Sequence, residues 1–351
     1  MKQALATALF AMSAAVVMSS FTAAAAPLDP NAPPEPSPGI LGMVYPATVQ
    51  GPIHATFAQP GPHTVAATQQ IHPCDDIGSV ILGTAYEYLG GFKNLDDALC
   101  TSSFPHGANS PWGMQYYYPT DLAPGEQAPV VQFQPGFTGD PGNYDQAARL
   151  WASRGFVVAM PYNFIDIFPT DPLWGLQALI GEEAKTDSPL HGHVDFGRTI
   201  IGGHSAGGEG AFWAAAYLPP LEKQIDPRLH ILGVLGVAPT PAPTGPAITI
   251  PALIMTGTRD AIVWDIFDRW VGYKTILFGP AYIAATINGE HFNITENLNN
   301  NEDAALATAW IEHLIGGHPD ADAVFVGPGW GLSTDPAFTW VERNQPADQL
   351  H

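Results

Sequence analysis

The chain has 351 residues and carries 12 Lys and Arg against 33 Asp and Glu, which gives a formal net charge of −21. Hydrophobic residues make up 46% of it, which excludes a disordered chain and is enough for a full core. A surface this acidic repels phosphate backbones. We therefore expect no nucleic-acid partner, and neutral molecules are favoured over anions as ligands.

The N-terminus has the order of a secretory signal peptide. Met1-Lys2 is a short positive start, Ala4–Val17 is apolar, and small residues lead to Pro27. We expect residues 1–25 to be the signal peptide, cleaved after Ala25, and the mature protein to be secreted, either extracellular or periplasmic. The alternative, an uncleaved anchor, is disfavoured because the apolar stretch is short for a span, and no later segment predicts a stable membrane span.

Two cysteines, Cys74 and Cys100, are present. An exported chain meets oxidising conditions, in which an even pair tends to close, so we expect a Cys74–Cys100 disulfide. The alternative is two buried free thiols.

Residues 26–60 are rich in Pro and Ala, and we interpret them as an extended leader, because proline fixes φ and removes a donor. Residues 61–351 then form a single domain. His63–Ile71 and Trp112–Pro119 are its first strand candidates. The segment between them, at about 73–110, contains both cysteines and does not fit the alternation of strands and helices. We interpret it as an insertion clasped by the disulfide, either a lid or a structural flap.

Short apolar runs alternate with helical spacing through the rest of the chain. Apolar runs with little alternation, separated by helices, are typical of a mostly parallel sheet covered by helices on both faces, so we expect the α/β fold class. Ligands of such sheets bind beyond the carboxyl ends of the strands. The strand candidates are Pro129–Phe133, Phe156–Met160, Thr199–Gly202, Leu229–Val237, Ala252–Thr256 and, as the last, Ala281–Ile287; the helix candidates are Tyr144–Arg154, Leu173–Ala184, Gly207–Leu218 and the closing Glu302–Ile315.

The motif Gly203-His204-Ser205-Ala206-Gly207 follows an apolar run and precedes a helix. That context is the one a nucleophile elbow requires, because the turn is too tight for side chains two residues either side of the serine. We expect Ser205 to be the nucleophile. The alternative is a chance G-x-S-x-G in a chain with 36 glycines.

A serine nucleophile needs a base, and in this fold class an acid and then a histidine follow it in the chain. Asp260 stands just past a buried-strand candidate and is the expected acid. His291, directly after the last strand candidate, is the expected base. The rivals for these roles are Asp265 and Asp268 for the acid, and His313 and His318 for the base.

The oxyanion of a tetrahedral intermediate needs donors. We expect one to be the backbone N–H of Ala206 and the other that of Phe137, in the loop after an early central strand. Gly136 would let that backbone approach closely. The alternative is a simple Pro-Gly turn.

Two other motifs are interpreted as non-functional. His191-Gly192-His193-Val194-Asp195 has the spacing of zinc ligands, but no further ligand follows it, so we expect no metal. Asn293-Ile294-Thr295 is a glycosylation sequon, but it adjoins the expected base, where a glycan is improbable.

Taken together, these residues resemble the bacterial cutinase-like lipases of the α/β-hydrolase class, a group that includes polyester hydrolases and lies close to chlorophyllases and dienelactone hydrolases. The similarity covers roughly residues 60–316. It is carried by Pro135-Gly136-Phe137, Val194-Asp195 before Arg198, Gly203 through Gly208, Pro251 through Asp260, and His291-Phe292.

The resemblance implies a cofactor-free acyl hydrolase with a Ser205-Asp260-His291 triad and an aromatic wall of the acyl site at Phe137. The Trp that polyester-cleaving members usually carry is absent from residues 238–243. Trp264 and Phe292 are candidates for other aromatic walls. We expect a secreted esterase or lipase that acts on small or polymeric neutral esters. The alternatives are a polyester hydrolase, an acyltransferase to an alcohol, and a noncatalytic cell-surface protein.

Overall fold

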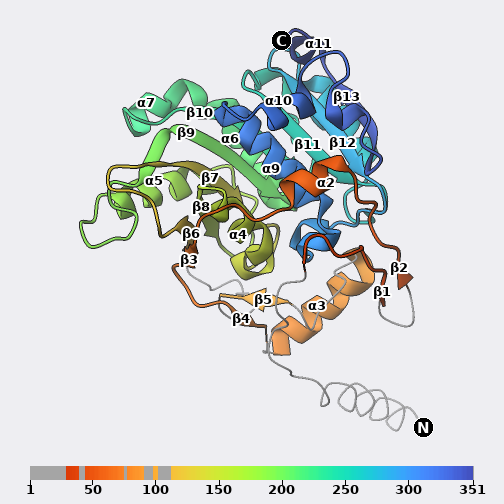
Figure 1. Cartoon of the computed structure of the whole chain (residues 1–351), viewed down its shortest axis with the longest axis horizontal. Helices are drawn as coiled ribbons and strands as arrows, with labels where there is room; N and C mark the ends of the chain where they lie inside the picture. The colour runs from red at the N-terminus through yellow and green to blue at the C-terminus, as the bar shows by residue number, and fades with distance from the viewer. Residues whose placement is uncertain (1–28, 39–43, 75–76, 91–97, 102–111, 351) are drawn as a thin grey trace.

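The structure, a computed structural model, describes residues 29–38, 44–74, 77–90, 98–101 and 112–350 (Figure 1). The expected signal peptide, residues 1–25, lies outside this part of the chain. Within the described ranges, no helix combines the length and the apolar character that crossing a membrane would require.

A nine-stranded sheet forms the centre of the described structure. Its six middle strands, β12 through β8, are parallel to one another, whereas β13, β6 and β3 continue its two edges by antiparallel pairing. In spatial order the strands are β13 (Phe338–Arg343), β12 (Ala281–Thr286), β11 (Ala252–Gly257), β10 (Ile231–Val237), β9 (Val194–His204), β7 (Ala128–Gln134), β8 (Val157–Tyr162), β6 (Gly113–Pro119) and β3 (Val65–Ala67).

Helices cover both faces of this sheet, as Figure 1 shows. One core cluster joins the sheet to α2 (Pro52–Phe57), α4 (Asp145–Ser153), α9 (Glu302–Ile315) and α10 (Pro319–Phe325). The other joins the opposite face to α5 (Asp171–Glu183) and α6 (Ser205–Tyr217). The expected architecture, a mostly parallel sheet with helices on both faces, is therefore confirmed. The short helices are α7 (Glu222–Ile225), α8 (Asp265–Phe267) and α11 (Gln345–Asp348).

Large aromatic side chains of α4, α9 and α10 pack against the sheet. Trp151 and Trp310 are fully buried, and the ring of Trp310 packs against those of Tyr282 and Phe325 at centroid distances of 5.5 and 5.0 Å. The indole N–H of Trp151 donates to the hydroxyl of Thr308 at 3.1 Å, so its burial leaves no orphan donor. Each such ring removes a large apolar area from water.

Two expectations about the chain ends are corrected. Ala281–Ile287 is not the last strand and Glu302–Ile315 is not the last element, because β13 pairs antiparallel with β12 at the edge of the sheet. Phe338–Arg343 mixes apolar and charged residues, as an edge strand with one solvated side does, and so lacks the apolar run by which buried strands are recognised. At the other end, Pro52–Phe57 of the expected leader forms α2, and its Ile53 and Phe57 belong to the core.

The segment between β3 and β6 contains β4 (His72–Pro73), α3 (Ile77–Gly90) and β5 (Leu99–Cys100), while residues 75–76, 91–97 and 102–111 lie outside the described structure. The expected Cys74–Cys100 disulfide is present and joins the ends of the paired strands β4 and β5. Figure 1 places α3 outside the layered body, at the lower edge of the view. A further short pair, β1 (Ser37–Pro38) and β2 (Val44–Tyr45), lies near the N-terminus.

A carboxyl group is buried at the start of α9. Asp303 is 4% exposed and accepts a hydrogen bond from the Thr286 hydroxyl at 2.6 Å. Burial raises its pKa from 3.8 to about 6. The unfolded chain therefore releases this proton at lower pH than the folded protein does. Stability contributed by the protonated carboxyl is present below pH 4 and is lost as the pH rises through 6.

We expect Asp303→Asn to be more stable than the wild type at pH 8 by about 3 kcal/mol and nearly equal to it at pH 3.5. The amide oxygen still accepts from Thr286, and the amide does not ionise. Urea unfolding at both pH values measures the difference, with the exposed Asp187→Asn as the control that shows none. An equal effect of Asp303→Asn at the two pH values would contradict this assignment.

Candidate active site

Ser205 stands on a tight turn between β9 and α6, where its φ of +53° lies in the left-handed region. The turn is possible because neighbouring backbones touch where a side chain would be. A Cβ on Gly203 would lie 2.4 Å from the backbone of Gly207, and one on Gly207 would lie 2.1 Å from the carbonyl oxygen of Pro135. This geometry is that of a nucleophile elbow, with Ser205 at the first turn of the helix.

A continuous hydrogen-bond chain links Ser205 to an imidazole and a carboxylate. The His291 Nε2 lies 2.9 Å from the Ser205 Oγ, and the His291 Nδ1 lies 2.7 Å from the Asp260 Oδ2. Because a carboxylate only accepts, Nδ1 carries the proton and Nε2 is free to accept from the serine. The other carboxylate oxygen of Asp260 accepts from the backbone N–H groups of Ile262 and Val263, both at 2.8 Å, and these bonds hold the carboxylate in place.

The rival residues occupy other places. The Nδ1 of His313 lies 2.7 Å from the Asp322 carboxylate, and that of His318 lies 3.9 Å from Glu312. Asp265 lies at the start of α8, is partly buried and is not among the residues that line the pocket at Ser205. Asp268 is fully buried, and burial raises its pKa well above the ordinary value.

The loop after β7 lies directly beside the serine. A Cβ on Gly136 would come within 3.1 Å of the Ser205 Cβ, so this glycine permits the approach. Three backbone N–H groups of this loop have partners: Gly136 donates to the Tyr144 hydroxyl, Thr138 to the Phe164 carbonyl and Gly139 to the Gly136 carbonyl.

The backbone N–H of Phe137 has no such partner among the described residues. Ala206 is the second residue of α6, where no carbonyl of the same helix is available to its N–H. The two groups expected to bind an oxyanion are therefore both available as donors beside Ser205.

A buried chain of hydrogen bonds, which the sequence did not reveal, ties this loop to the base. The Gly136 N–H donates to the Tyr144 hydroxyl at 2.9 Å, and that hydroxyl lies 2.8 Å from the His204 Nδ1. The His204 Nε2 lies 2.8 Å from the carbonyl oxygen of His291, which only accepts. His204 therefore carries its proton on Nε2 and accepts from Tyr144 on Nδ1. Burial holds the pKa of His204 well below its ordinary value, which keeps the ring neutral.

A pocket with a volume of about 90 Å³ opens at Ser205 and His291. Phe137 and Phe292, both expected as walls, line it. Trp264 does not: it is 59% exposed and stacks on Phe267, whereas Ile262 from the same segment reaches the pocket. Tyr86, from the segment expected to be an insertion, is a wall that no motif indicated. The main side chains around the serine are Tyr86, Phe137, Tyr144, Ile262, Phe292 and Thr295.

The side chains of the His191–Asp195 motif make structural contacts elsewhere, and the Asn of the Asn293–Thr295 sequon is buried. The Nδ1 of His191 lies 2.8 Å from the Glu183 carbonyl, that of His193 lies 2.9 Å from the Glu126 carbonyl, and Asp195 pairs with Arg198. The three side chains therefore have separate partners. Asn293 of the sequon is fully buried, where a glycan could not be accommodated.

A strand–serine–helix turn at the edge of a mostly parallel sheet, with an acid and then a histidine following in the chain, defines the α/β-hydrolase class. The family model described as PET hydrolase-like matches residues 99–324, more than half of the chain. The chain therefore belongs to the PET hydrolase-like family, which confirms the resemblance to polyester hydrolases.

The chain is also similar to the bis(hydroxyethyl) terephthalate hydrolase of Streptomyces coelicolor. The two are 27% identical over 206 residues, which make up 58% of this chain and 62% of that protein. The match thus spans less than two thirds of the relative's length.

We expect Gly207→Ala to destabilise the protein by about 3 kcal/mol or more, because its Cβ would overlap the Pro135 carbonyl and the backbone would have to move. Gly181→Ala is the matched control: this helical glycine has open space around its Cβ position, so the alanine should stabilise by up to about 1 kcal/mol. Thermal unfolding measures both, and a Gly207→Ala protein as stable as the control would refute the tight turn.

Proposed function

We propose that the protein is a serine carboxylic-ester hydrolase that works through an acyl-enzyme on Ser205. The observation that carries the proposal is the bond chain from the Ser205 Oγ through His291 to the buried Asp260. Serine is a weak nucleophile until a base removes its proton, and His291 Nε2 is within hydrogen-bond distance for that transfer.

In the first half of the reaction, Ser205 Oγ attacks the ester carbonyl while its proton passes to His291 Nε2. Asp260 stabilises the imidazolium that forms. The N–H groups of Phe137 and Ala206 donate to the oxyanion of the tetrahedral intermediate. The carbon–oxygen bond to the alcohol then breaks, and His291 returns its proton to the leaving alcohol. The acyl group remains on Ser205.

In the second half, a water molecule gives a proton to His291 and attacks the acyl carbonyl. As the second tetrahedral intermediate collapses, the bond from the carbonyl carbon to Ser205 Oγ breaks and His291 gives the proton to Ser205 Oγ, which releases the carboxylic acid and restores the Ser205 hydroxyl. The steps use one ester and one water, and no metal or cofactor takes part.

For the substrate we propose neutral esters, including polymeric ones. The net charge of −21 disfavours anionic substrates. Membership of the PET hydrolase-like family favours the polyester type. Phe137 is 51% exposed in the loop beside the serine. Trp264 and Phe267, which follow Asp260 in the chain, are also exposed and stack on each other. Exposed apolar surface of this kind suits a hydrophobic polymer.

We further propose that the protein is secreted after removal of residues 1–25. The Cys74–Cys100 disulfide supports this location, since such bonds persist in oxidising compartments.

Ser205→Ala should lower kcat for 4-nitrophenyl butanoate by at least about a thousandfold, because it removes the nucleophile, and His291→Ala should do the same. Asp265→Asn, on the next segment, is the matched control and should retain wild-type turnover. Unchanged turnover by Ser205→Ala would overturn the mechanism. Acid release that falls short of nitrophenol release when an alcohol is added would instead identify an acyltransferase.

Tyr144→Phe should lower kcat with little change in KM, because the loop that presents the Phe137 N–H loses its tie to His204. The unpaired Gly136 N–H also costs about 1–3 kcal/mol of stability. Tyr282→Phe is the control: it removes a buried hydroxyl bonded to the Phe325 carbonyl, far from the serine, and should reduce stability alone. Equal kcat values in the two variants would argue against the link.

A further inference from the structure

Helix α3 brings the side chain of Tyr86 into the pocket at Ser205. Its hydroxyl lies 2.5 Å from the Thr138 Oγ1 and 3.4 Å from the carbonyl oxygen of Phe137. Its ring packs against that of Phe292 at a centroid distance of 5.0 Å. Tyr86 thus bridges the loop that carries Phe137 and the segment that follows His291.

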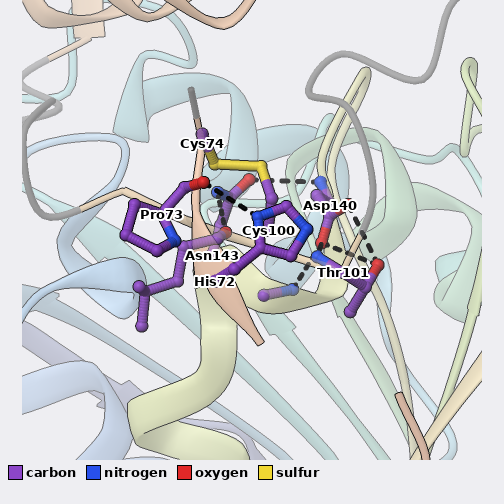
Figure 2. Close-up of a disulfide and its surroundings, with 9 residues drawn as sticks. His72, Pro73, Cys74, Cys100, Thr101, Asp140 and Asn143 are labelled. Atoms are coloured by element: carbon purple, nitrogen blue, oxygen red, sulfur yellow. Dashed lines mark hydrogen bonds between the residues drawn. A yellow bond between two sulfur atoms is a disulfide. The ribbon is translucent and has the colours of Figure 1, made fainter. Parts of the chain in front are cut away.

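The end of β5, in the segment that contains α3, is also hydrogen-bonded to the loop that carries Phe137. The disulfide joins Cys74 to Cys100, and the following Thr101 donates both its backbone N–H and its hydroxyl to the Asp140 carboxylate, at 2.7 and 3.0 Å (Figure 2). The Asn143 amide donates to the Leu99 carbonyl at 2.9 Å.

Asp140 itself caps the short helix η3 (Pro141–Tyr144), which carries Tyr144. The segment is therefore tied to the site at two points: by Tyr86 in the pocket and by β5 at η3. Reorienting the Tyr86 side chain would break its hydrogen bond to Thr138 and its packing on Phe292, so we treat it as a fixed wall of the pocket.

The family match begins at residue 99, so α3 and Tyr86 lie outside the matched residues. The walls contributed by Phe137 and Phe292 lie inside the match. The part of the pocket that Tyr86 closes is thus formed by a residue outside the matched range.

We propose that Tyr86 is a specificity-determining residue, which limits the size of the acyl group that the pocket accepts. The inference rests on the proposed function, and it adds which esters the enzyme selects by the length of their acyl group. Phe137 is the residue expected to line the acyl site, and the Tyr86 hydroxyl is bonded beside it. The Tyr86 ring therefore occupies space into which a longer acyl chain would extend.

The test compares kcat/KM for 4-nitrophenyl esters of acetic, butanoic, octanoic and dodecanoic acids. The measured quantity is the octanoate-to-acetate ratio, in which a general loss of activity cancels. Tyr86→Ala should raise this ratio by about tenfold or more, because several methylenes gain apolar contact. Tyr86→Trp should lower it. Tyr86→Phe keeps the ring and should keep the wild-type ratio.

Ile81→Ala is the matched control on the same helix: Ile81 is 64% exposed and does not line the pocket, so its loss should leave the ratio unchanged. Unchanged ratios in both Tyr86→Ala and Tyr86→Trp would overturn the inference, as would an Ile81→Ala ratio that moves with Tyr86→Ala. A wild-type protein that hydrolyses none of the four esters would instead refute the proposed function.

Discussion

Three stretches of backbone meet at the serine with no side chain between them. The end of β9, the start of α6 and the loop after β7 approach so closely that Gly203, Gly136 and Gly207 cannot be replaced without displacing main-chain atoms or the serine itself. The serine is held in a left-handed conformation that an isolated chain would avoid, at a cost of about 1–3 kcal/mol. The buried sheet and helix on either side of the turn keep it there.

The other parts of the site are positioned relative to this turn. His204, whose ring lies beside that of His291, connects through Tyr144 to Gly136 and through its other nitrogen to the backbone of His291. The loop with the expected oxyanion donor and the base thus share one buried residue of the elbow. A network in which each donor has an acceptor holds geometry well, and the same burial makes any missing partner costly.

The segment between β3 and β6, which contains the disulfide and α3, lies outside the hydrogen-bonded network of His204, Tyr144 and Gly136 and adds Tyr86 to the pocket wall. The family match, residues 99–324, covers seven strands of the sheet and the elbow, but leaves out β3, β13 and the first cysteine. A hydrolase can keep its catalytic residues while the walls of its pocket vary. The catalytic residues stand at the edge of the sheet, whereas connecting segments contribute side chains to the walls. Trp264 illustrates the difficulty of placing walls from sequence: it is on the right segment but faces outward, and its neighbour Ile262 lines the pocket instead.

The sequence by itself determined the parallel core, since buried strands with two neighbours are continuous apolar runs, as in β8 and β10. It also indicated Ser205, Asp260 and His291, because the chain order and the strand ends restrict each choice to a few residues.

Only the tertiary structure decided the edge strand β13, the helix α2, the link through Tyr144 and the position of Tyr86. These depend on contacts between residues far apart in the chain, such as Tyr86 with Phe292 or Tyr144 with His204. No local periodicity or spacing encodes such contacts. They arise when the folded sheet brings separate loops to the same edge, which is where the pocket forms.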